Sequence, residues 1–203
     1  MDAFLKGLEQ RVATGQPIDH ITSVASFFVS RVDTKVDKRL EGLLYEEGTR
    51  SKLAKSLLGK AAVANARLAY SLFNETFKSQ RFSVLQAKGA HFQRPLWAST
   101  STKNPAYSDI LYVQELIGPH TVNTMPQKTL EDFLDHGEAR LTLERGLDQA
   151  KRVMEKLEGL GVSMDEVTQE LEDEGVESFA RSFNSLIESI EKRRRSVGDA
   201  TPR

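Results

Sequence analysis

The stretch RPLWASTSTKNP, residues 94–105, places a single lysine behind a short apolar run and a series of hydroxyl side chains. A lysine in this setting has three possible roles: it forms a Schiff base, it binds an anion, or it simply reaches water from a loop. A Schiff base requires a lowered pKa, from an apolar pocket or a second cation, together with acid–base partners. Because Ser99–Thr102 surround Lys103 with hydroxyl groups, the pattern favours anion binding over nucleophilic catalysis.

Two other stretches offer polar side chains after apolar runs. SFFVSRVD, residues 26–33, contains Ser26 and Arg31, and VNTMP, residues 122–126, contains Asn123 and Thr124. Ligands of parallel α/β folds bind at the carboxyl ends of strands, and arginine and lysine are the usual phosphate-binding side chains. The sequence therefore predicts a phosphate or oxyanion site. A simpler alternative for Arg31 is a surface ion pair with Asp33 or Asp37.

The elements that must position these residues alternate along the first two thirds of the chain. We expect strands over 22–33, 94–99 and 120–126 and helices over 2–14, 34–44, 59–77, 81–88, 106–118 and 127–137. This alternation predicts parallel strands with right-handed helical crossovers, which is an α/β fold.

The last third of the chain contains only helix signals. An apolar stripe runs from Leu143 to Leu157, and a helix over 163–175 opens with Ser163 and Glu166, which are spaced as a capping box. A final helix ends in the basic run 192–195, and residues 196–203 are expected to fray. We accordingly divide the chain into residues 1–137 and a helical extension over 138–203.

Composition excludes several classes of function. The chain of 203 residues has a net charge of −1 and no cysteine, so thiolate chemistry is excluded and no global attraction to nucleic acid is expected. The four histidines are scattered without metal-ligand spacing, and neither GxGxxG nor GxxxxGK[ST] occurs. The apolar runs are too short to span a membrane, and the N-terminus carries acidic residues unlike a secretory signal. We expect a cytoplasmic protein with no metal, nucleic-acid or membrane partner.

Four long segments carry a family resemblance. VASFFVSRVDTKVDKRL, GKAAVANARLAY, QRPLWASTSTKNPAYSDILYVQELIGPHTVNTMP and LEDEGVESF, in one collinear order, resemble the transaldolase family in its longer bacterial type, from about residue 3 to residue 195. The resemblance implies a (β/α)₈ barrel of the pentose phosphate pathway. Such an enzyme transfers a dihydroxyacetone unit between sugar phosphates through a lysine Schiff base, without a metal or organic cofactor.

The resemblance also assigns roles by position. Arg31 and Lys103 correspond to the residues that bind the substrate phosphate, with Lys103 in place of an arginine of other branches, and Ser26 and Ser101 correspond to substrate-contacting hydroxyls. Ser26 and Arg31 have opposite strand parity, so both can reach one pocket only if the chain bends near Ser30.

The departures from the family concern catalysis. No motif here resembles the family's Schiff-base segment MVKIPAT, and the catalytic Asp and Glu positions have no counterpart. The three strands resemble strands six to eight. We therefore expect an incomplete barrel that comes from a truncated or split gene or from an internal start. It is expected to have no catalytic residue of its own and no activity alone, and a complementary N-terminal barrel chain is the implied partner. The alternative is a non-catalytic assembly module. An aldolase using Lys103 is disfavoured, because Asp33 is its only nearby acid–base candidate.

Overall fold

The computed structural model describes residues 1–198, and the chain divides into a compact unit over Met1–Val162 and a second unit that begins at Ser163. The first unit contains all three strands and eight helices: α1 (Asp2–Ala13), β1 (Ser23–Phe28), α2 (Val29–Leu43), α3 (Thr49–Leu57), α4 (Ala61–Phe77), α5 (Gln80–Gln86), β2 (Gln93–Ala98), α6 (Leu111–Glu115), β3 (Val122–Asn123), α7 (Gln127–His136) and α8 (Leu147–Gly159). The second unit contains α9 (Met164–Gly198).

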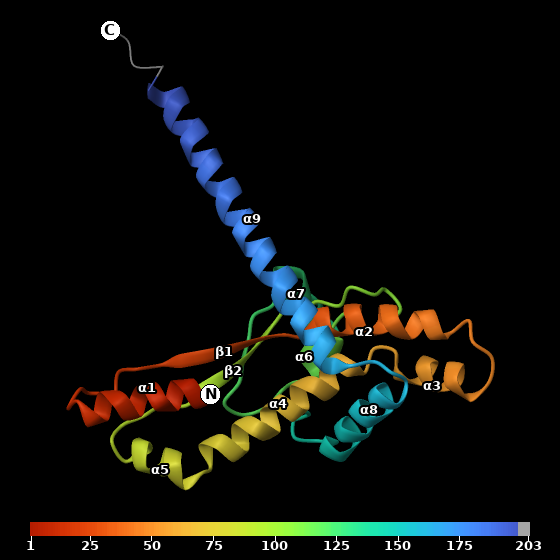
Figure 1. The fold of residues 1–203 in the computed structure, drawn as a ribbon, viewed down its shortest axis with the longest axis horizontal. Coiled ribbons are helices and arrows are strands. Elements are labelled where there is room, and N and C mark those ends of the chain that lie inside the picture. Colours follow the sequence, from red (N-terminus) through yellow and green to blue (C-terminus); the bar gives the residue numbers. More distant parts are fainter. Residues whose placement is uncertain (199–203) are drawn as a thin grey trace. The chain divides into compact units, whose positions relative to one another are not determined.

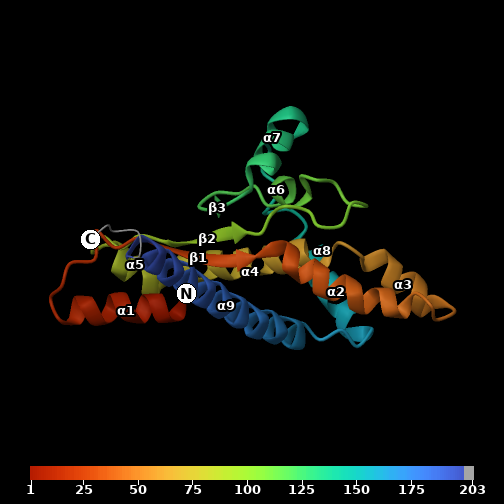
Figure 2. The same cartoon turned by 90° about the horizontal axis from the view of Figure 1, so that it is seen from above.

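The three strands form one parallel sheet in the order β1-β2-β3, which confirms the predicted α/β class. β1 pairs with β2 along its whole length, from Ser23 opposite Gln93 to Phe28 opposite Ala98. β3 is only two residues long, and its Val122 lies opposite Leu96. Figures 1 and 2 both show β1 and β2 side by side. Because the strands are parallel, their carboxyl ends lie at the same end of the sheet.

The two faces of the sheet differ in burial. Trp97 is fully buried and meets Phe27 edge-to-face, with ring centroids 5.8 Å apart. On the opposite face of β1, Val24 and Phe28 are 40% and 39% exposed. Because side chains of a strand alternate between faces, the first unit covers one face of its sheet and leaves the other partly open.

Helix α4 organises the core of the first unit. Helix α4 packs against α2 and α8, and its Ala61, Ala62, Ala64 and Ala66 are buried. Small side chains such as alanine let neighbouring helices approach closely. Further along α4, Phe73 and Phe77 join Phe82 of α5 and Phe92 in a cluster with neighbouring ring centroids 4.8–6.0 Å apart. This aromatic cluster packs α4 and α5 beneath the start of β2.

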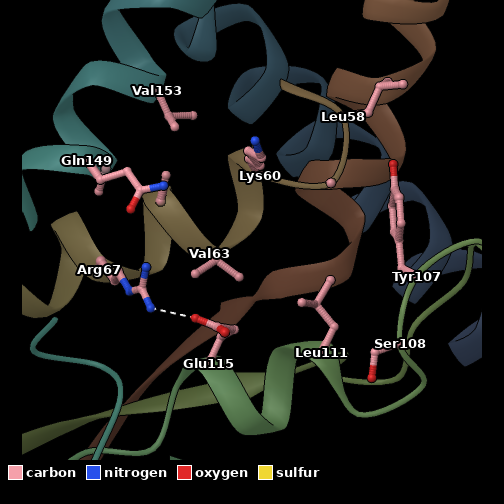
Figure 3. Close-up of a pocket in the computed structure, with 13 residues that line it drawn as sticks. Leu58, Lys60, Val63, Arg67, Tyr107, Ser108, Leu111, Glu115, Gln149 and Val153 are labelled. Carbon is pink, nitrogen blue, oxygen red and sulfur yellow. Dashed lines mark hydrogen bonds and ion pairs between the residues drawn. The ribbon is translucent and has the colours of Figure 1, made fainter. Parts of the chain in front are cut away.

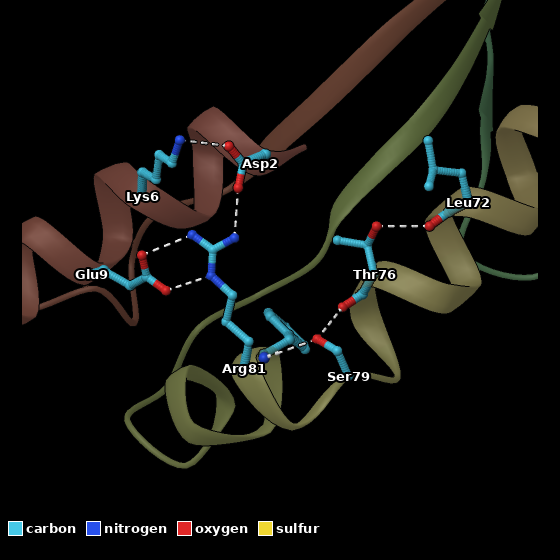
Figure 4. Close-up of polar contacts among 8 residues, drawn as sticks. Asp2, Lys6, Glu9, Leu72, Thr76, Ser79 and Arg81 are labelled. Carbon is cyan, nitrogen blue, oxygen red and sulfur yellow. Dashed lines mark hydrogen bonds and ion pairs between the residues drawn. The ribbon is translucent and has the colours of Figure 1, made fainter.

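Arg81 of α5 ties the first helix to this layer. Its guanidinium donates two hydrogen bonds to the carboxylate of Glu9 (2.6 and 2.8 Å) and one to Asp2 (2.6 Å), and Lys6 also pairs with Asp2 (Figure 4). These hydrogen bonds lower the pKa of Asp2 to about 2 and that of Glu9 below its usual value, because they stabilise the charged carboxylates.

Most predicted elements are present, but several bounds were wrong. The first strand ends at Phe28, and residues 29–33, predicted as strand, form the first turns of α2. Helix α3 was not predicted, and α6 covers only five residues of the helix expected over 106–118. The two helices expected after residue 163 are one continuous α9, which passes through Gly175 without a break.

The C-terminal third begins its last helix where the sequence indicates. Ser163 accepts a hydrogen bond from the backbone N–H of Glu166 (3.3 Å), as expected for an N-cap. The compact unit extends past residue 137 to Val162 and includes α8, which packs against α4. The functional division of the chain at residue 137 stays a prediction. Fraying was expected over 196–203: the helix continues to Gly198, and residues 199–203 lie outside the described part.

Candidate functional site

The ends of β1 and β2 are joined by two hydrogen bonds. The backbone N–H of Ser30 donates to the carbonyl of Ser99 (3.0 Å), and the two serine hydroxyls lie 2.9 Å apart. Ser99 has φ = 55°, in the left-handed region that non-glycine residues rarely adopt. Such a conformation persists only where the surroundings enforce it, and here the contacts to Ser30 do so.

The end of β3 is joined to the same edge through Thr100. The buried Thr100 hydroxyl contacts the Asn123 amide oxygen (2.9 Å) and the Thr124 carbonyl (3.2 Å), and the N–H of Thr124 donates to the Trp97 carbonyl (2.9 Å). Asn123 and Thr124 had been considered as ligand-binding candidates. In the structure both contact Thr100, and Thr124 also binds the backbone of β2, so they hold two strand ends together.

The predicted phosphate-binding residues lie beside these junctions. Ser26 is exposed on the open face of β1, opposite Leu96. Arg31 lies in the first turn of α2, where its guanidinium carbon is 4.9 Å from the ring centroid of Phe28, a cation–π contact. A bend of the chain near Ser30 was expected, because Ser26 and Arg31 would otherwise point to opposite faces of one strand. In the structure the chain changes from strand to helix at Val29.

Lys103 and Ser101 are in direct contact. The Lys103 ammonium donates to the Ser101 hydroxyl at 2.8 Å, and the Lys103 side chain is exposed. The structure therefore brings these two predicted residues together in the loop that follows β2. An exposed lysine is not enclosed by the apolar pocket that a Schiff-base nucleophile requires.

The carboxylates considered as partners of Arg31 are used elsewhere. Asp33 is buried and accepts hydrogen bonds from the Ala62 N–H (2.8 Å) and the Tyr112 hydroxyl (2.8 Å). Asp37, one helical turn later, accepts from the Gly59 N–H (3.0 Å) and the Tyr107 hydroxyl (2.8 Å).

These contacts make Asp33 and Asp37 structural residues. They bind backbone donors at and just before the start of α4, where a helix leaves its first N–H groups unpaired. Burial raises the pKa of Asp33 to about 6, against the opposing effect of its hydrogen bonds, and raises the pKa of Asp37 for the same reason. Asp33 therefore fits neither the ion pair with Arg31 nor the role of acid–base partner to Lys103.

Comparison with known proteins identifies the family. The family model described as transaldolase/fructose-6-phosphate aldolase matches residues 7–190. The chain belongs to this family. It is 52% identical over 192 residues to a transaldolase from Renibacterium salmoninarum, 50% over 192 residues to one from Mycolicibacterium smegmatis, and 51% over 191 residues to one from Thermobifida fusca.

Each of these alignments covers 94% of this chain but 50% of the relative. The chain therefore spans about half the length of the curated transaldolases it matches. All four predicted site residues lie within the matched region, because it extends from residue 7 to residue 190.

A cavity of about 360 Å³ in this transaldolase-family chain is lined by α4, α8 and the segment from Tyr107 to Glu115. Its wall combines apolar side chains with the pair Arg67–Glu115, whose charged atoms are 2.6 Å apart (Figure 3). It is lined by Leu58, Gly59, Lys60, Val63, Ala64, Arg67, Tyr107, Ser108, Leu111, Glu115, Gln149, Ala150 and Val153. None of the four predicted site residues lines it.

Within residues 1–198, no group of three or more His, Asp or Glu side chains is arranged to hold a metal ion. In the same part of the chain, no helix has the length and apolar character that crossing a bilayer requires. The sequence gives only a weak indication that Ser99 and Thr100 connect the strand ends, because both lie in a run of four hydroxyl residues, 99–102.

Proposed function

We propose that this chain supplies the phosphate-binding part of a transaldolase-type transferase, which moves a dihydroxyacetone unit between sugar phosphates through a lysine Schiff base. The observation that carries the proposal is the pair of hydrogen bonds between Ser30 and Ser99. These bonds join the segment that contains Arg31 to the segment that contains Ser101 and Lys103. Membership of the family supports the substrate class, sugar phosphates.

Each residue has a chemical role in the proposal. Arg31 offers a planar fork that matches two phosphate oxygens, and Lys103 offers a mobile point charge. Ser101, which accepts from Lys103 at 2.8 Å, orients that ammonium. Ser26 lies on the open face of β1, where its hydroxyl is available to a sugar hydroxyl.

The Schiff-base lysine and its acid–base partners come from outside these 203 residues in this proposal. Residues 1–137 then form the last three strands of a (β/α)₈ barrel, and residues 138–203 form its helical extension. Val24 and Phe28 lie on the partly open face of β1. In a closed barrel such a face would be covered by the side chains of the other strands. The partner is a complementary N-terminal half-barrel.

The test is a split-enzyme assay. The purified chain is given fructose 6-phosphate and erythrose 4-phosphate, alone and together with the N-terminal half of the Thermobifida fusca transaldolase. We expect no turnover from the chain alone and turnover from the pair. Lys103→Gln should weaken the activity of the pair mainly by raising KM for the phosphorylated substrate, whereas Lys88→Gln, which removes an exposed cation after α5, should change nothing.

Borohydride trapping tests the assignment of the lysine. An adduct on Lys103, or full turnover by the chain alone, would contradict the proposal. An adduct on a lysine of the added half, together with none on this chain, would support it.

A non-catalytic assembly module is the second candidate, and the short β3 with the partly open sheet face favours it. The two functions differ in their response to ligand. If the phosphate site is functional, fructose 6-phosphate should raise the Tm of the chain. Binding increases the free energy of unfolding by RT ln(1 + [L]/Kd), so the Tm should rise with ligand concentration. No change in Tm up to millimolar ligand would favour the assembly module.

A further inference from the structure

Helix α9 carries a stripe of large apolar side chains that the proposed phosphate site does not use. The stripe consists of Val176, Phe179, Phe183, Leu186, Ile187 and Ile190, each between 40% and 67% exposed. A contiguous row of large apolar side chains on the surface of a single chain usually marks a site that another surface covers.

The spacing of the stripe is that of a coiled coil. Val176, Phe179, Phe183, Leu186 and Ile190 follow one another at intervals of 3, 4, 3 and 4 residues, the a and d positions of a heptad repeat. We propose that this stripe is a homodimerisation surface, on which α9 of a second copy of this chain packs in antiparallel orientation.

The charge pattern of α9 selects the second copy and its direction. Residues 165–177 contain seven acidic residues and no basic one, whereas residues 192–195 are Lys-Arg-Arg-Arg. In a parallel pair the acidic segments of the two helices would lie side by side, and so would the two basic ends, so that like charges would repel. An antiparallel pair places the basic end of each helix beside the acidic segment of the other.

The heptad restricts the antiparallel pair to registers that differ by whole heptads, and we propose the register that is centred between Phe183 and Leu186. In that orientation a positions pack against d positions, so Phe183 meets Leu186 of the partner subunit, and Phe179 meets Ile190 of the partner subunit. The e positions then face one another across one flank, which pairs Asp173 with Arg194 of the partner subunit. On the same flank Ile187 meets the partner's Ala180, so a large side chain lies opposite a small one.

The size of the surface is adequate for a dimer. The two helices together contribute four phenylalanines, and a phenylalanine buries about 150–250 Å² when it is fully covered. With the eight aliphatic side chains of the two stripes, the contact approaches the ~1,200 Å² typical of specific interfaces. Acidic and basic flanks add specificity and association rate rather than bulk affinity.

The first experiment measures the mass of the full chain by sedimentation equilibrium, without substrate or partner. We expect a dimer at micromolar concentration. Phe183→Glu puts a charge into the seam and should weaken the dimer by about a hundredfold, because each dimer contains the position twice. Ser185→Glu, at an outward c position two residues away, introduces the same charge and should leave the dimer intact.

The second experiment tests orientation. Arg194→Glu should weaken the dimer several-fold, because it places a carboxylate against the partner's Asp173, and adding Asp173→Arg should restore the dimer. Because the chain has no cysteine, disulfides between single-cysteine variants report distance without background. Ser182→Cys mixed with Ser189→Cys should give a cross-linked heterodimer, since these g positions face each other only in the antiparallel pair.

Three results would overturn the inference. These are a monomer at all concentrations up to about 100 µM, a dimer that Phe183→Glu does not weaken, and a charge swap that fails to restore association. A dimer that forms while the split-enzyme assay fails would leave this inference standing and contradict only the proposed function.

Discussion

The hydroxyls of Ser30 and Ser99 lie 2.9 Å apart, although the two residues are 69 positions apart in the chain. The backbone N–H of Ser30 also donates to the Ser99 carbonyl at 3.0 Å. Ser30 is the second residue of α2 and Ser99 directly follows β2, so this pair joins the first crossover helix to the next strand end. The left-handed φ of Ser99 is a consequence of that connection.

Removing both hydroxyls should reveal a coupling between these residues. We expect Ser30→Ala and Ser99→Ala each to lower the free energy of unfolding by about 1 kcal/mol, and the double variant to lose clearly less than the sum, because both changes remove the same hydrogen bond. Urea unfolding of the four proteins measures the coupling. Strictly additive losses would mean that the two hydroxyls act independently, and Ser185→Ala serves as an exposed control.

Asp33 should give the chain a stability that falls as pH rises from about 4 to 6. Its carboxyl has a pKa near 4 when unfolded and about 6 when folded, because burial disfavours the charged form. Between these values the folded chain holds a proton that the unfolded chain releases, so unfolding becomes easier as pH increases. Two pKa units correspond to about 3 kcal/mol.

Asp33→Asn isolates this effect, because the amide does not titrate. The difference in unfolding free energy between wild type and variant, measured at about pH 4 and about pH 7, should change by about 3 kcal/mol in favour of the variant. The comparison cancels the opposite contributions of Asp2 and Glu9, whose pKa values are lowered. A difference that stays constant with pH would show that folding does not raise the pKa of Asp33.

Burial should decide which polar contact matters more for stability. Thr100→Val keeps the shape of a fully buried side chain but removes the donor to Asn123, and we expect it to cost about 1–3 kcal/mol. Arg81→Met removes three charged hydrogen bonds, yet its side chain is 37% exposed and its partners lie at the surface. Water replaces such contacts at little cost, so its effect should be the smaller and should shrink further in about 1 M salt. The reverse order in urea unfolding would contradict this argument.

The sequence predicted the elements whose signals are local. The strand at 94–99 could be found because an apolar run ends in polar residues, and α4 because alanine favours helix. It failed over 29–33, where Val29 and Val32 favour a strand. There the tertiary structure wins, because only a helix brings both Asp33 and Asp37 to the region where α4 begins.

The candidate site was predictable by type and not by geometry. Residues with hydroxyl and cationic side chains at strand ends indicate an anion site, but the roles of Ser99 and Thr100 depend on the register of β1, β2 and β3, which a pattern does not contain. Helix α6 was overestimated for a similar reason. Residues 104–108 form turns, in which Asn104 accepts from the Ala106 N–H (2.9 Å) and Thr102 donates to the Ser108 carbonyl (2.7 Å).

Two glycines should respond oppositely to alanine. Gly89 ends the segment after α5 with φ = 93°, and a Cβ there would lie 2.8 Å from the Asp19 Cβ, so Gly89→Ala combines backbone strain with a clash. We expect a loss of about 1–3 kcal/mol. Gly42 lies inside α2 with nothing within 4 Å of a built Cβ, so Gly42→Ala should stabilise by up to about 1 kcal/mol through helix propensity. Thermal unfolding of both variants checks the pair, since a Gly89→Ala chain as stable as wild type would show that the loop before β2 adjusts without cost.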